Sequence, residues 1–358
     1  MTKISMTDIV IIGAGMAGLT CAQKLTKAGY SVKIIEKSRG VGGRVATRRL
    51  YDTRADHGAC YIKPKGELLQ NLVDELFQKG ILQVWTDTVY QLRANASKPI
   101  PDSPSPRYIA PDGMSAIAKF IAKDLDIHFS QRASKIASTP DSIWQIITES
   151  GEEFTAKALA IAIPAPQAVE VLDTFIQESL LKERLPLNGS FLDKLKSADY
   201  YPSISVMAGY PKNINLPEWK ALTFSDDKVL GWIGVDSSKR IKSSQPLLVF
   251  QSSANFAQKY FESLDLQAVG EEILKYAAQC IDFSWMNNPE FIQVHRWRYA
   301  FPRHPLAETY LSADTELPLV CCGDWCGGEL IGGAMKSGYD AAEAIKKQLD
   351  ILSTPKSV

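Results

Sequence analysis

The stretch from Asp8 to Arg44 decides the fold, and it reads DIVIIGAGMAGLTCAQKLTKAGYSVKIIEKSRGVGGR. The apolar run at residues 9–12 has no polar face, so it predicts a buried strand. The glycine turn at 13–18 leads into a helical pattern over 19–28, which Gly29 ends. A second strand over 32–35 stops at Glu36. This order predicts a Rossmann-type strand–turn–helix–strand unit.

The glycines of this turn have separate uses. Gly13 permits the tight bend, Gly15 lets a pyrophosphate approach the backbone, and Gly18 lets the helix pack closely on the strand. The first helical N–H groups would face the phosphates, whose charge the helix dipole favours. A carboxylate at Glu36 can accept hydrogen bonds from both hydroxyls of an adenosine ribose. Together they predict a dinucleotide site; the alternative is a glycine turn that binds nothing.

The loop after Glu36 favours a flavin over a nicotinamide dinucleotide. A simple NAD dehydrogenase usually continues into another βαβ unit, whereas this chain continues with a basic, glycine-rich loop over 37–44. Gly42 and Gly43 would bring a second backbone segment to the pyrophosphate, and Arg44 could neutralise it. The arrangement resembles the extended glycine motif of the FAD-containing amine oxidase superfamily. Further candidate cofactor contacts here are Met16, Ala17 and Lys37.

Composition describes an ordinary globular protein. Forty Lys and Arg balance forty Asp and Glu, so neither nucleic acid nor an acidic membrane is expected as a partner. No apolar run approaches the ~20 residues that span a bilayer, residues 1–8 lack a signal-peptide core, and residues 346–358 are polar. The six cysteines form no C-x-x-C pair, so we expect reduced thiols, no metal site and a cytoplasmic location.

A chain of 358 residues is long for one domain, and two are expected. We assign residues 1–80, 108–166 and 300–358 to an FAD-binding domain, and 81–107 and 167–299 to a substrate domain. Periodicity predicts helices over 68–79, 115–122, 265–280 and 339–349, and one starting near 168. It predicts strands over 84–92, 127–136, 143–149, 153–156, 157–162, 201–210, 229–235, 247–252 and 317–321, with a loop at 96–107. The fold class is therefore α/β, a Rossmann-type domain with a second, mixed-sheet α+β domain.

Residues 53–61 read TRADHGACY and predict a short turn of small residues. In the amine oxidase superfamily a similar acid-x-Gly-(Gly/Ala) segment lies against the isoalloxazine ring, which makes Gly58 and Ala59 candidate flavin contacts. His57 and Tyr61 flank the pair. A lone histidine is more often structural than catalytic, but we keep His57 as a candidate for both the cofactor and the substrate, and Tyr61 for the substrate.

Two later segments add candidates. In flavoproteins of this type, a strand such as 127–136 contacts the adenine through its backbone, which suggests Ala133 and Lys135; Pro164 lies where the chain leaves the cofactor domain. The run HRWRYA at 295–300 would place Arg296 and Arg298 on one face of a strand, and Trp297 and Tyr299 on the other. These side chains suit an anionic or planar substrate; the alternative is an aromatic core strand with a solvated arginine face.

A second strong motif follows the predicted strand at 317–321. It reads GDWCGGELIGGAMKSG over residues 323–338 and leads into a helix. Gly323 and Asp324 would meet the ribityl chain or the pyrophosphate, and amides at Gly333 and Ala334 would meet the flavin pyrimidine at a helix N-terminus. Ile331 is a further candidate contact. Cofactor motifs at both ends of the chain favour FAD over NAD.

In order along the chain, the motifs resemble those of the renalase family, particularly its bacterial members. The segments that carry the resemblance are 13–18, Glu36, 42–49, 56–59, 111–114, 296–300 and 323–338. The resemblance implies a p-hydroxybenzoate hydroxylase-like fold and non-covalent FAD. It also implies oxidation of the 2- and 6-dihydro isomers of NAD(P) to β-NAD(P)⁺, with hydride transfer to flavin N5 and reoxidation by O₂ to hydrogen peroxide.

Two alternatives remain from the residues. An amine oxidase or desaturase commonly uses a lysine near flavin N5, and Lys336 lies in the last motif, although its spacing suggests an exposed helix position. The second is a flavin-binding sensor or partner protein without turnover. No residue stands out as a catalytic base, which suits a dihydronicotinamide substrate because its oxidation needs little acid–base help.

Overall fold

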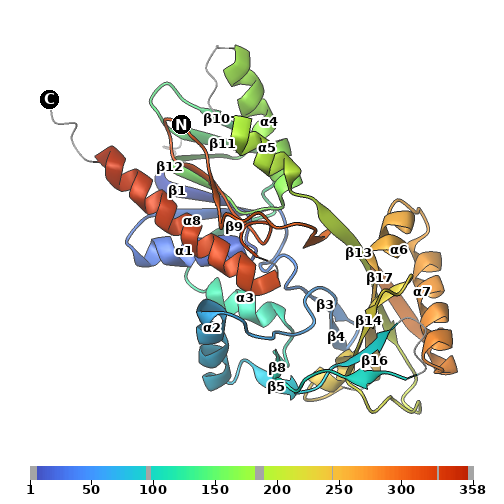
Figure 1. Cartoon of the computed structure of the whole chain (residues 1–358). Coiled ribbons are helices and arrows are strands. Elements are labelled where there is room, and N and C mark those ends of the chain that lie inside the picture. The colour runs from blue at the N-terminus through green and yellow to red at the C-terminus, as the bar shows by residue number, and fades with distance from the viewer. Residues whose placement is uncertain (1–5, 94–97, 182–188, 244, 329, 354–358) are drawn as a thin grey trace. The chain divides into compact units, whose positions relative to one another are not determined.

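The computed structural model describes residues 6–93, 98–181, 189–243, 245–328 and 330–353. The chain divides into two compact units, whose elements are labelled in Figure 1. Unit 1 comprises Met1–Gly43, Ala118–Asp199 and Pro302–Val358, and unit 2 comprises Arg44–Ile117 and Tyr200–Phe301. The five segments alternate as expected from the sequence, but the boundaries differ. The first falls after Gly43 rather than residue 80, because Asp56 is tied by ion pairs to Lys239 and Arg240.

Unit 1 is built on an eight-stranded sheet whose main path runs β10-β11-β12-β1-β2-β9, with β19 and β18 attached through β12. The strands are β1 (Thr7–Ile12), β2 (Val32–Glu36), β9 (Asp126–Phe129), β10 (Ala133–Ser138), β11 (Trp144–Thr148), β12 (Glu153–Ile161), β18 (Leu311–Ser312) and β19 (Leu319–Cys321). β1 pairs in parallel with both β2 and β12. Ile9, Val10 and Ile11 are fully buried, as expected for a parallel strand covered on both faces.

The helices of unit 1 are α1 (Met16–Lys27), α4 (Ala165–Leu181), α5 (Gly189–Ser197) and α8 (Leu330–Ser353). Gly29 follows the C-terminal end of α1, and its φ of +92° suits a residue without a side chain. α1 and α8 lie side by side (Figure 1). They approach so closely that a Cβ at Gly338 would lie only 2.0 Å from the carbonyl oxygen of Ala17. Among the described residues, no helix is long and apolar enough to cross a membrane.

Unit 2 is built on a seven-stranded sheet of order β17-β13-β16-β15-β14-β6-β7. Its strands are β6 (Tyr90–Arg93), β7 (Ile100–Pro101), β13 (Tyr200–Gly209), β14 (Ala221–Ser225), β15 (Leu230–Val235), β16 (Leu247–Ser252) and β17 (Phe291–Pro302, which runs one residue into unit 1). Two small sheets pair β3 (Thr47–Leu50) with β4 (Thr53–Asp56), and β5 (Gln83–Thr86) with β8 (Arg107–Ile109). The helices are α2 (Glu67–Gln78), α6 (Ala254–Tyr260) and α7 (Leu266–Cys280), while α3 (Ser115–Ile121) spans the unit boundary.

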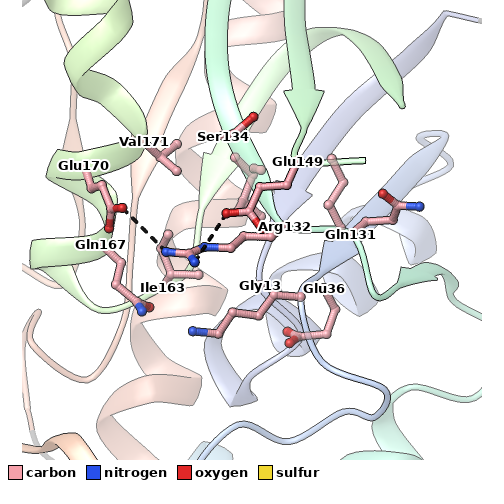
Figure 2. A pocket seen from close by; sticks show the side chains of 14 residues that line it. Gly13, Glu36, Gln131, Arg132, Ser134, Glu149, Ile163, Gln167, Glu170 and Val171 are labelled. Carbon is pink, nitrogen blue, oxygen red and sulfur yellow. Dashed lines mark hydrogen bonds and ion pairs between the residues drawn. The ribbon is translucent and has the colours of Figure 1, made fainter. Parts of the chain in front are cut away.

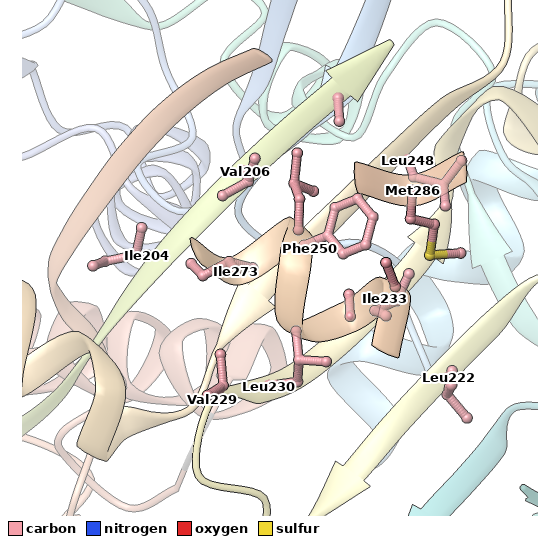
Figure 3. Packing of buried hydrophobic residues seen from close by; sticks show 14 of the residues in the cluster. Ile204, Val206, Leu222, Val229, Leu230, Ile233, Leu248, Phe250, Ile273 and Met286 are labelled. Atoms are coloured by element: carbon pink, nitrogen blue, oxygen red, sulfur yellow. The ribbon is translucent and has the colours of Figure 1, made fainter. Parts of the chain in front are cut away.

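One face of this sheet forms the core of unit 2. Ile204, Val206, Leu248 and Phe250 from the strands pack against Ile273 of α7 (Figure 3). Each of these side chains is fully buried. The opposite face carries Ser205, Gln251 and Trp297, which donate hydrogen bonds to the backbone carbonyls of residues 57 and 58.

Several predicted elements are confirmed, and others differ. The α/β architecture with a Rossmann-type sheet is confirmed, and so is the hairpin around Gly151, which joins β11 to β12. The predicted strand 127–136 is wrong as one element, because Ser130 with φ +57° separates β9 from β10. β9 pairs with β2 at one edge of the sheet, and β10 pairs with β11 at the other edge.

Three further boundaries are corrected. The predicted strand 84–92 is two strands, β5 and β6, which lie in different sheets. Between these strands the amide of Val89 donates to the Asp102 carboxylate, and the amide of Thr88 donates to the Thr86 hydroxyl. Within the predicted turn 53–61, the first four residues form β4, which pairs with β3. The predicted loop 96–107 contains β7 and the first residue of β8, while residues 96 and 97 lie outside the described residues. The helix predicted over 339–349 begins at Leu330.

Candidate functional site

The glycine turn of unit 1 has the expected geometry. Gly13 has φ +105°, its amide donates to the carbonyl of Ile35 at 2.8 Å, and a Cβ there would lie 2.7 Å from the carbonyl oxygen of Ala162. A Cβ at Gly18 would lie 1.9 Å from the carbonyl oxygen of Gly13, whereas a Cβ at Gly15 would meet nothing within 4 Å. Gly13 and Gly18 are therefore needed for packing. Gly15 alone opens onto free space, where a pyrophosphate would lie.

Glu36 ends β2 with its carboxylate held in place. One oxygen accepts the amide of Ala14 and the other accepts the amide of Ser38, each at 2.8 Å. The residue is 9% exposed. A carboxylate oxygen has two lone pairs, so each oxygen can still accept one ribose hydroxyl. The predicted role of Glu36 is compatible with this geometry, and the two amides fix its orientation.

The glycine loop after β2 folds back onto the turn. The amide of Gly42 donates to the carbonyl of Ala14 at 2.8 Å, and Gly15 and Gly42 form a parallel bridge. A Cβ at Gly43 would approach the Cα of Gly15 to 3.6 Å. Two backbone segments thus meet at one point, as the sequence predicted. Arg44, the next residue, begins unit 2, where its guanidinium donates to the carbonyl of Ala300 at 3.1 Å.

A pocket of unit 1 lies at the carboxyl ends of β1 and β2 (Figure 2). It encloses about 140 Å³, roughly ten times the smallest cavity that holds one water. The residues that line it are Ile12, Gly13, Ile35, Glu36, Lys37, Gln131, Arg132, Ala133, Ser134, Glu149, Ile163, Gln167, Glu170 and Val171. Its position beside Glu36 suits the adenosine end of a dinucleotide.

Sequence reasoning identified part of this lining. It named Gly13, Glu36, Lys37 and Ala133, but Lys135 and Pro164 are not among the lining residues. It missed Arg132, which bridges Glu149 at 3.3 Å and Glu170 at 3.5 Å across the pocket edge (Figure 2). Arg132 and Glu149 lie in loops and Glu170 lies on α4, so no local pattern pointed to this group. The acidic residues on α4 were hidden in an ordinary amphipathic helix.

The second glycine motif is partly a packing device. The amide of Gly323 donates to Ser337 at 2.9 Å, and Asp324 is buried. A Cβ at Gly333 would lie 2.1 Å from the carbonyl oxygen of Gly328, so that glycine is needed for a tight fold.

The start of α8 decides which amides lack a partner within the helix. Leu330 has φ +64°, so the right-handed turns begin at Ile331. Helix geometry then leaves the amides of Ile331 and Gly333 without an acceptor in the helix, whereas the amide of Ala334 is positioned to bond to the carbonyl of Leu330. The helix begins earlier than its sequence pattern indicated, and the flavin contacts of Gly333 and Ala334 stay predictions.

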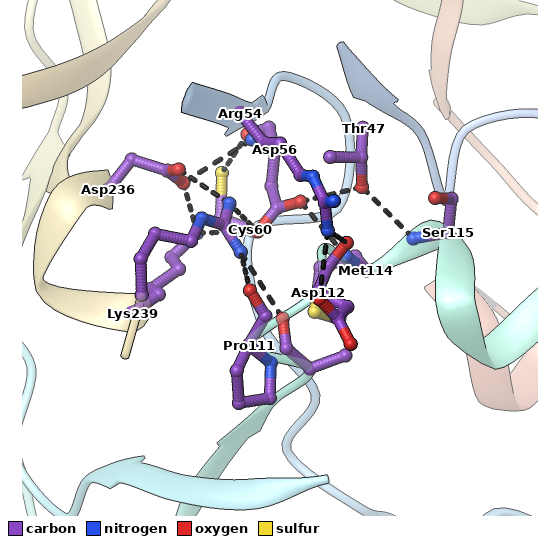
Figure 4. A network of polar contacts seen from close by, with 12 residues as sticks. Thr47, Arg54, Asp56, Cys60, Pro111, Asp112, Met114, Ser115, Asp236 and Lys239 are labelled. Atoms are coloured by element: carbon purple, nitrogen blue, oxygen red, sulfur yellow. Dashed lines mark hydrogen bonds and ion pairs between the residues drawn. The ribbon is translucent and has the colours of Figure 1, made fainter. Parts of the chain in front are cut away.

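In unit 2, a buried ion cluster anchors the segment at 56–60 (Figure 4). Asp56 and Asp236 are fully buried, and Lys239 and Arg240 bridge both carboxylates at 2.6–3.3 Å. The second oxygen of Asp56 accepts the Thr47 hydroxyl at 2.7 Å and the amide of Met114 at 2.9 Å. Burial alone would raise the pKa of Asp56, but the two cations hold it below its ordinary value. Sequence analysis had not identified Asp236, Lys239 or Arg240.

The next residues are held by their carbonyl groups. The carbonyl of His57 accepts the Ser205 hydroxyl at 2.8 Å and the indole N–H of Trp297 at 2.9 Å. Gln251 donates to the carbonyl of Gly58 at 2.8 Å. A Cβ at Gly58 would lie 2.0 Å from the carbonyl oxygen of Arg44, so only glycine fits. Three strands of the unit 2 sheet thus fix the segment that the sequence singled out.

The side chain of His57 packs against two aromatic rings from β17. Its centroid is 5.2 Å from that of Trp297 in a stacked arrangement and 4.9 Å from that of His295. Burial lowers the pKa of His57 to about 3, with contributions from His295 and Arg48. Burial and Arg48 likewise lower the pKa of His295 to about 4. Both imidazoles are therefore neutral at physiological pH.

The remaining substrate candidates do not join this group. Arg296 donates to the carbonyl of Phe261 at 2.6 Å, and Arg298 pairs with Glu262 at 2.9 Å. Both guanidinium groups lie over the Phe261 ring, on the face of β17 opposite Trp297. The arginine face is thus a packed, solvated surface, the alternative that the sequence had left open. Tyr299 packs on Tyr200 and Tyr61 on Trp232.

The thiols and possible metal ligands offer no further chemistry. All six cysteines are free thiols, and five of them are buried. Burial raises the pKa of Cys60 and of Cys322 to about 12, so neither forms a thiolate at neutral pH. Among the described residues, no three His, Cys, Asp or Glu side chains gather as a metal site would require.

Two family models match the chain. Residues 11–76 match an NAD(P)-binding Rossmann-like domain, and residues 103–346 match the flavin containing amine oxidoreductase family. The fold and the site thus define a dinucleotide-dependent oxidoreductase. The chain belongs to the flavin containing amine oxidoreductase family, and its cofactor is FAD. Gly15 with the open space above it, Glu36 and the adjoining pocket fit that cofactor.

Individual relatives match over short segments. The putative flavin-containing monoamine oxidase AofH of Mycobacterium tuberculosis is 41% identical over 69 residues, which are 19% of this chain and 15% of that protein. An L-amino-acid oxidase of Crotalus adamanteus is 42% identical over 65 residues, 18% of this chain and 13% of the relative. The chain thus covers less than a sixth of the length of these relatives.

Solved structures match over nearly the whole chain. Putrescine oxidase bound to putrescine has a TM-score of 0.69 and 14% identity, covering 98% of this chain and 100% of that one. Cyclohexylamine oxidase from Brevibacterium oxydans has a TM-score of 0.70 and 13% identity, covering 97% and 100%. At this identity the likeness establishes the fold alone.

Proposed function

We propose that the protein is an FAD-dependent oxidase of the renalase type, which converts the 2- and 6-dihydro isomers of NAD(P) to β-NAD(P)⁺. When bound, FAD supplies the acceptor for the hydride that the substrate loses and passes the electrons to O₂, giving hydrogen peroxide. The observation that carries the proposal is the neutral character of the polar groups beside the 56–60 segment. His57 and His295 have pKa values of about 3 and 4, so neither is an effective base at neutral pH.

A dihydronicotinamide suits such a surface. When its ring loses a hydride, it becomes an aromatic pyridinium, and no proton has to be removed. The protein needs only to hold the ring in place and to keep water away. Trp297 and His57, stacked and fixed through the hydrogen bond from the Trp297 indole to the His57 carbonyl, provide a rigid aromatic surface for this purpose.

An amine would need more. Aliphatic amines resemble the lysine side chain, with a pKa of about 10.4, and arrive protonated, so a site that oxidises them must favour the neutral form. Lys336, the lysine that the amine oxidase alternative suggested, is exposed and paired with Asp340. Lys239 is buried but bridges two carboxylates. Lys336 is thus an exposed helix residue, and Lys239 is engaged in the buried ion cluster.

Amine oxidation remains the second candidate because of the relatives. The matched proteins include a putative monoamine oxidase, L-amino-acid oxidases, putrescine oxidase and cyclohexylamine oxidase. The short matched segments and low identities support the family rather than any one substrate.

The test is an anaerobic titration of the purified, FAD-loaded protein. One sample receives a mixture of 2- and 6-dihydro-NAD(P), and others receive β-NADH, putrescine or cyclohexylamine. We expect the isomers alone to bleach the flavin absorbance and to yield β-NAD(P)⁺. Bleaching by an amine would replace the proposal with the second candidate. If no compound bleached the flavin, the protein would be better described as a flavin-binding partner or sensor without turnover.

A further inference from the structure

A compact group of side chains in unit 2 brings together residues from three of the sequence motifs described above and adds Gln293. We call it the Arg48 cluster; it consists of Arg48 on β3, His57, and Gln293, His295 and Trp297 on β17. Arg48 donates to the amide oxygen of Gln293 at 3.3 Å. The rings of His295 and Trp297 are 4.4 Å apart, and each is within 5.2 Å of the ring of His57.

The cluster contains hydrogen-bonding groups that the described chain does not fully use. His57 is only 6% exposed, yet its Nδ1 has no hydrogen-bond partner among the described residues. A buried polar nitrogen left without a partner is costly, and its presence commonly marks a ligand or a functional constraint. Arg48 carries five N–H donors, of which the bond to Gln293 uses one. Arg48, His295 and Trp297 are half-buried, so part of each side chain is open.

The charges select among the small groups that could bind here. Each neutral imidazole offers one donor and one acceptor nitrogen, and the guanidinium of Arg48 offers donors only. A carboxylate has only acceptors, so it could bind Arg48 and the imidazole donors but would leave the acceptor nitrogen of each imidazole unpaired. An ammonium has only donors and would be repelled by the Arg48 charge. A primary carboxamide has a carbonyl acceptor and two N–H donors in one plane, so it satisfies both kinds of group.

We propose that the Arg48 cluster binds the primary carboxamide of a planar ring, with Arg48 donating to its carbonyl, an imidazole of His57 or His295 accepting from its NH₂, and the ring resting on Trp297. This inference rests on the proposed function, since it names the part of a dihydronicotinamide that the chain recognises. The cluster thereby favours a nicotinamide ring over an amine by its charge and its donor–acceptor pattern. Arg48, His57, His295 and Trp297 are then substrate-binding residues rather than acid–base groups.

The experiment measures ligand binding separately from turnover. The FAD-loaded protein is labelled with ¹⁵N-histidine, and the four histidines of the chain give a small set of signals. His57→Gln and His295→Gln variants assign two of them. Nicotinamide, nicotinate and benzylamine are then titrated in turn. We expect nicotinamide to shift the His57 and His295 signals and to bind more tightly than nicotinate, and benzylamine to leave them unmoved.

Two arginines of the same strand provide a matched pair of variants. Arg48→Met should weaken nicotinamide binding by about tenfold or more, the loss that removal of a charge-assisted hydrogen bond produces. Arg49→Met is the control, because Arg49 is the exposed neighbour on β3 and alternation turns its side chain to the other face. Arg48→Lys keeps the charge without the planar fork and should lose affinity by several-fold. If Arg48→Met does not fold, the Lys variant and the histidine signals decide the matter.

The outcomes separate this inference from the proposed function. If nicotinamide binds through Arg48 but no dihydronicotinamide bleaches the flavin, the carboxamide site stands and the proposed reaction fails. If the isomers are oxidised but Arg48→Met binds nicotinamide as the parent protein does, the carboxamide site is refuted and the reaction stands. Equal or tighter binding of nicotinate, or silent histidine signals, would also refute the site.

Discussion

Replacing Lys239 with methionine should destabilise unit 2 strongly. The substitution keeps the length of the side chain but leaves Asp56 and Asp236, both fully buried, with Arg240 as their only cation within the cluster. Removing one partner from a buried ion pair costs about 3–5 kcal/mol, because the remaining charge is uncompensated. At about 2–4 °C per kcal/mol for a domain of 150–250 residues, the melting temperature should fall by roughly 6–20 °C.

The pH dependence of stability distinguishes the loss of a buried charge from a mere loss of packing. In the parent protein the pKa of Asp56 is lowered, so its contribution to stability is present above the unfolded value of 3.8 and is lost as the pH falls through the folded pKa. In Lys239→Met, burial without the second cation should raise the pKa of one carboxyl. The folded state then binds that proton more tightly than the unfolded state, so lowering the pH should stabilise the variant.

The assay is thermal unfolding at saturating FAD between pH 5 and pH 8, with Lys239→Met compared with the parent. The double variant Lys239→Met, Asp236→Asn removes one charge of each sign and should regain much of the lost stability. A loss below about 1 kcal/mol, or a pH dependence equal to that of the parent, would contradict the view that these charges are coupled and buried.

Three other substitutions or conditions test the site. Gly15→Val should fold but lose FAD, because Gly15 has φ −77° and a side chain there would point into empty space. Gly18→Val should not fold, because its side chain would collide with the carbonyl oxygen of Gly13. Measurements of flavin content and melting temperature distinguish the two variants. Glu36→Gln should weaken FAD binding by about tenfold or more in a fluorescence titration, because its new NH₂ would face the amide of Ala14 or Ser38. The rate of flavin reduction should show no histidine ionisation between pH 6 and pH 9, because His57 and His295 are already neutral there; a step near pH 6.5 that His57→Gln or His295→Gln removed would contradict this.

The cofactor half of the protein was largely predictable from sequence because its chemistry lies in short segments. A strand, three glycines and an acid occur within one βαβ unit, and each residue type has one dominant geometric use. The structure agrees with the predicted packing role of Gly18 and adds Gly338, since a Cβ at either would collide with a carbonyl oxygen. What failed was the division of strands, as at Ser130, where a single left-handed residue interrupts the segment 127–136 that was predicted as one strand.

The second unit was less predictable because its key contacts are long-range. Asp56 meets Lys239 and Arg240, and His57 meets Trp297, across most of the length of the chain. Lys239 and Arg240 follow a strand in a polar stretch that reads as an exposed turn, so nothing local indicated that they are buried. The alternation along β17 did predict which residues share a face, but not which face packs against His57.

In three consecutive residues, 56–58, the charged group holds the backbone in place while the neutral groups remain beside it. Asp56 stays charged because two cations and several donors surround it, and this fixes the backbone that follows. His57 is buried like Asp56 but lies next to Arg48 and another imidazole, so it stays neutral. Gly58 has no side chain, because Arg44 and Trp297 occupy that space. The charged groups are thus engaged in holding the segment, and the surface beside it presents the neutral imidazoles of His57 and His295 and the guanidinium of Arg48. Such a face can orient an uncharged polar ring without exchanging protons with it, which is what oxidation of a dihydronicotinamide requires.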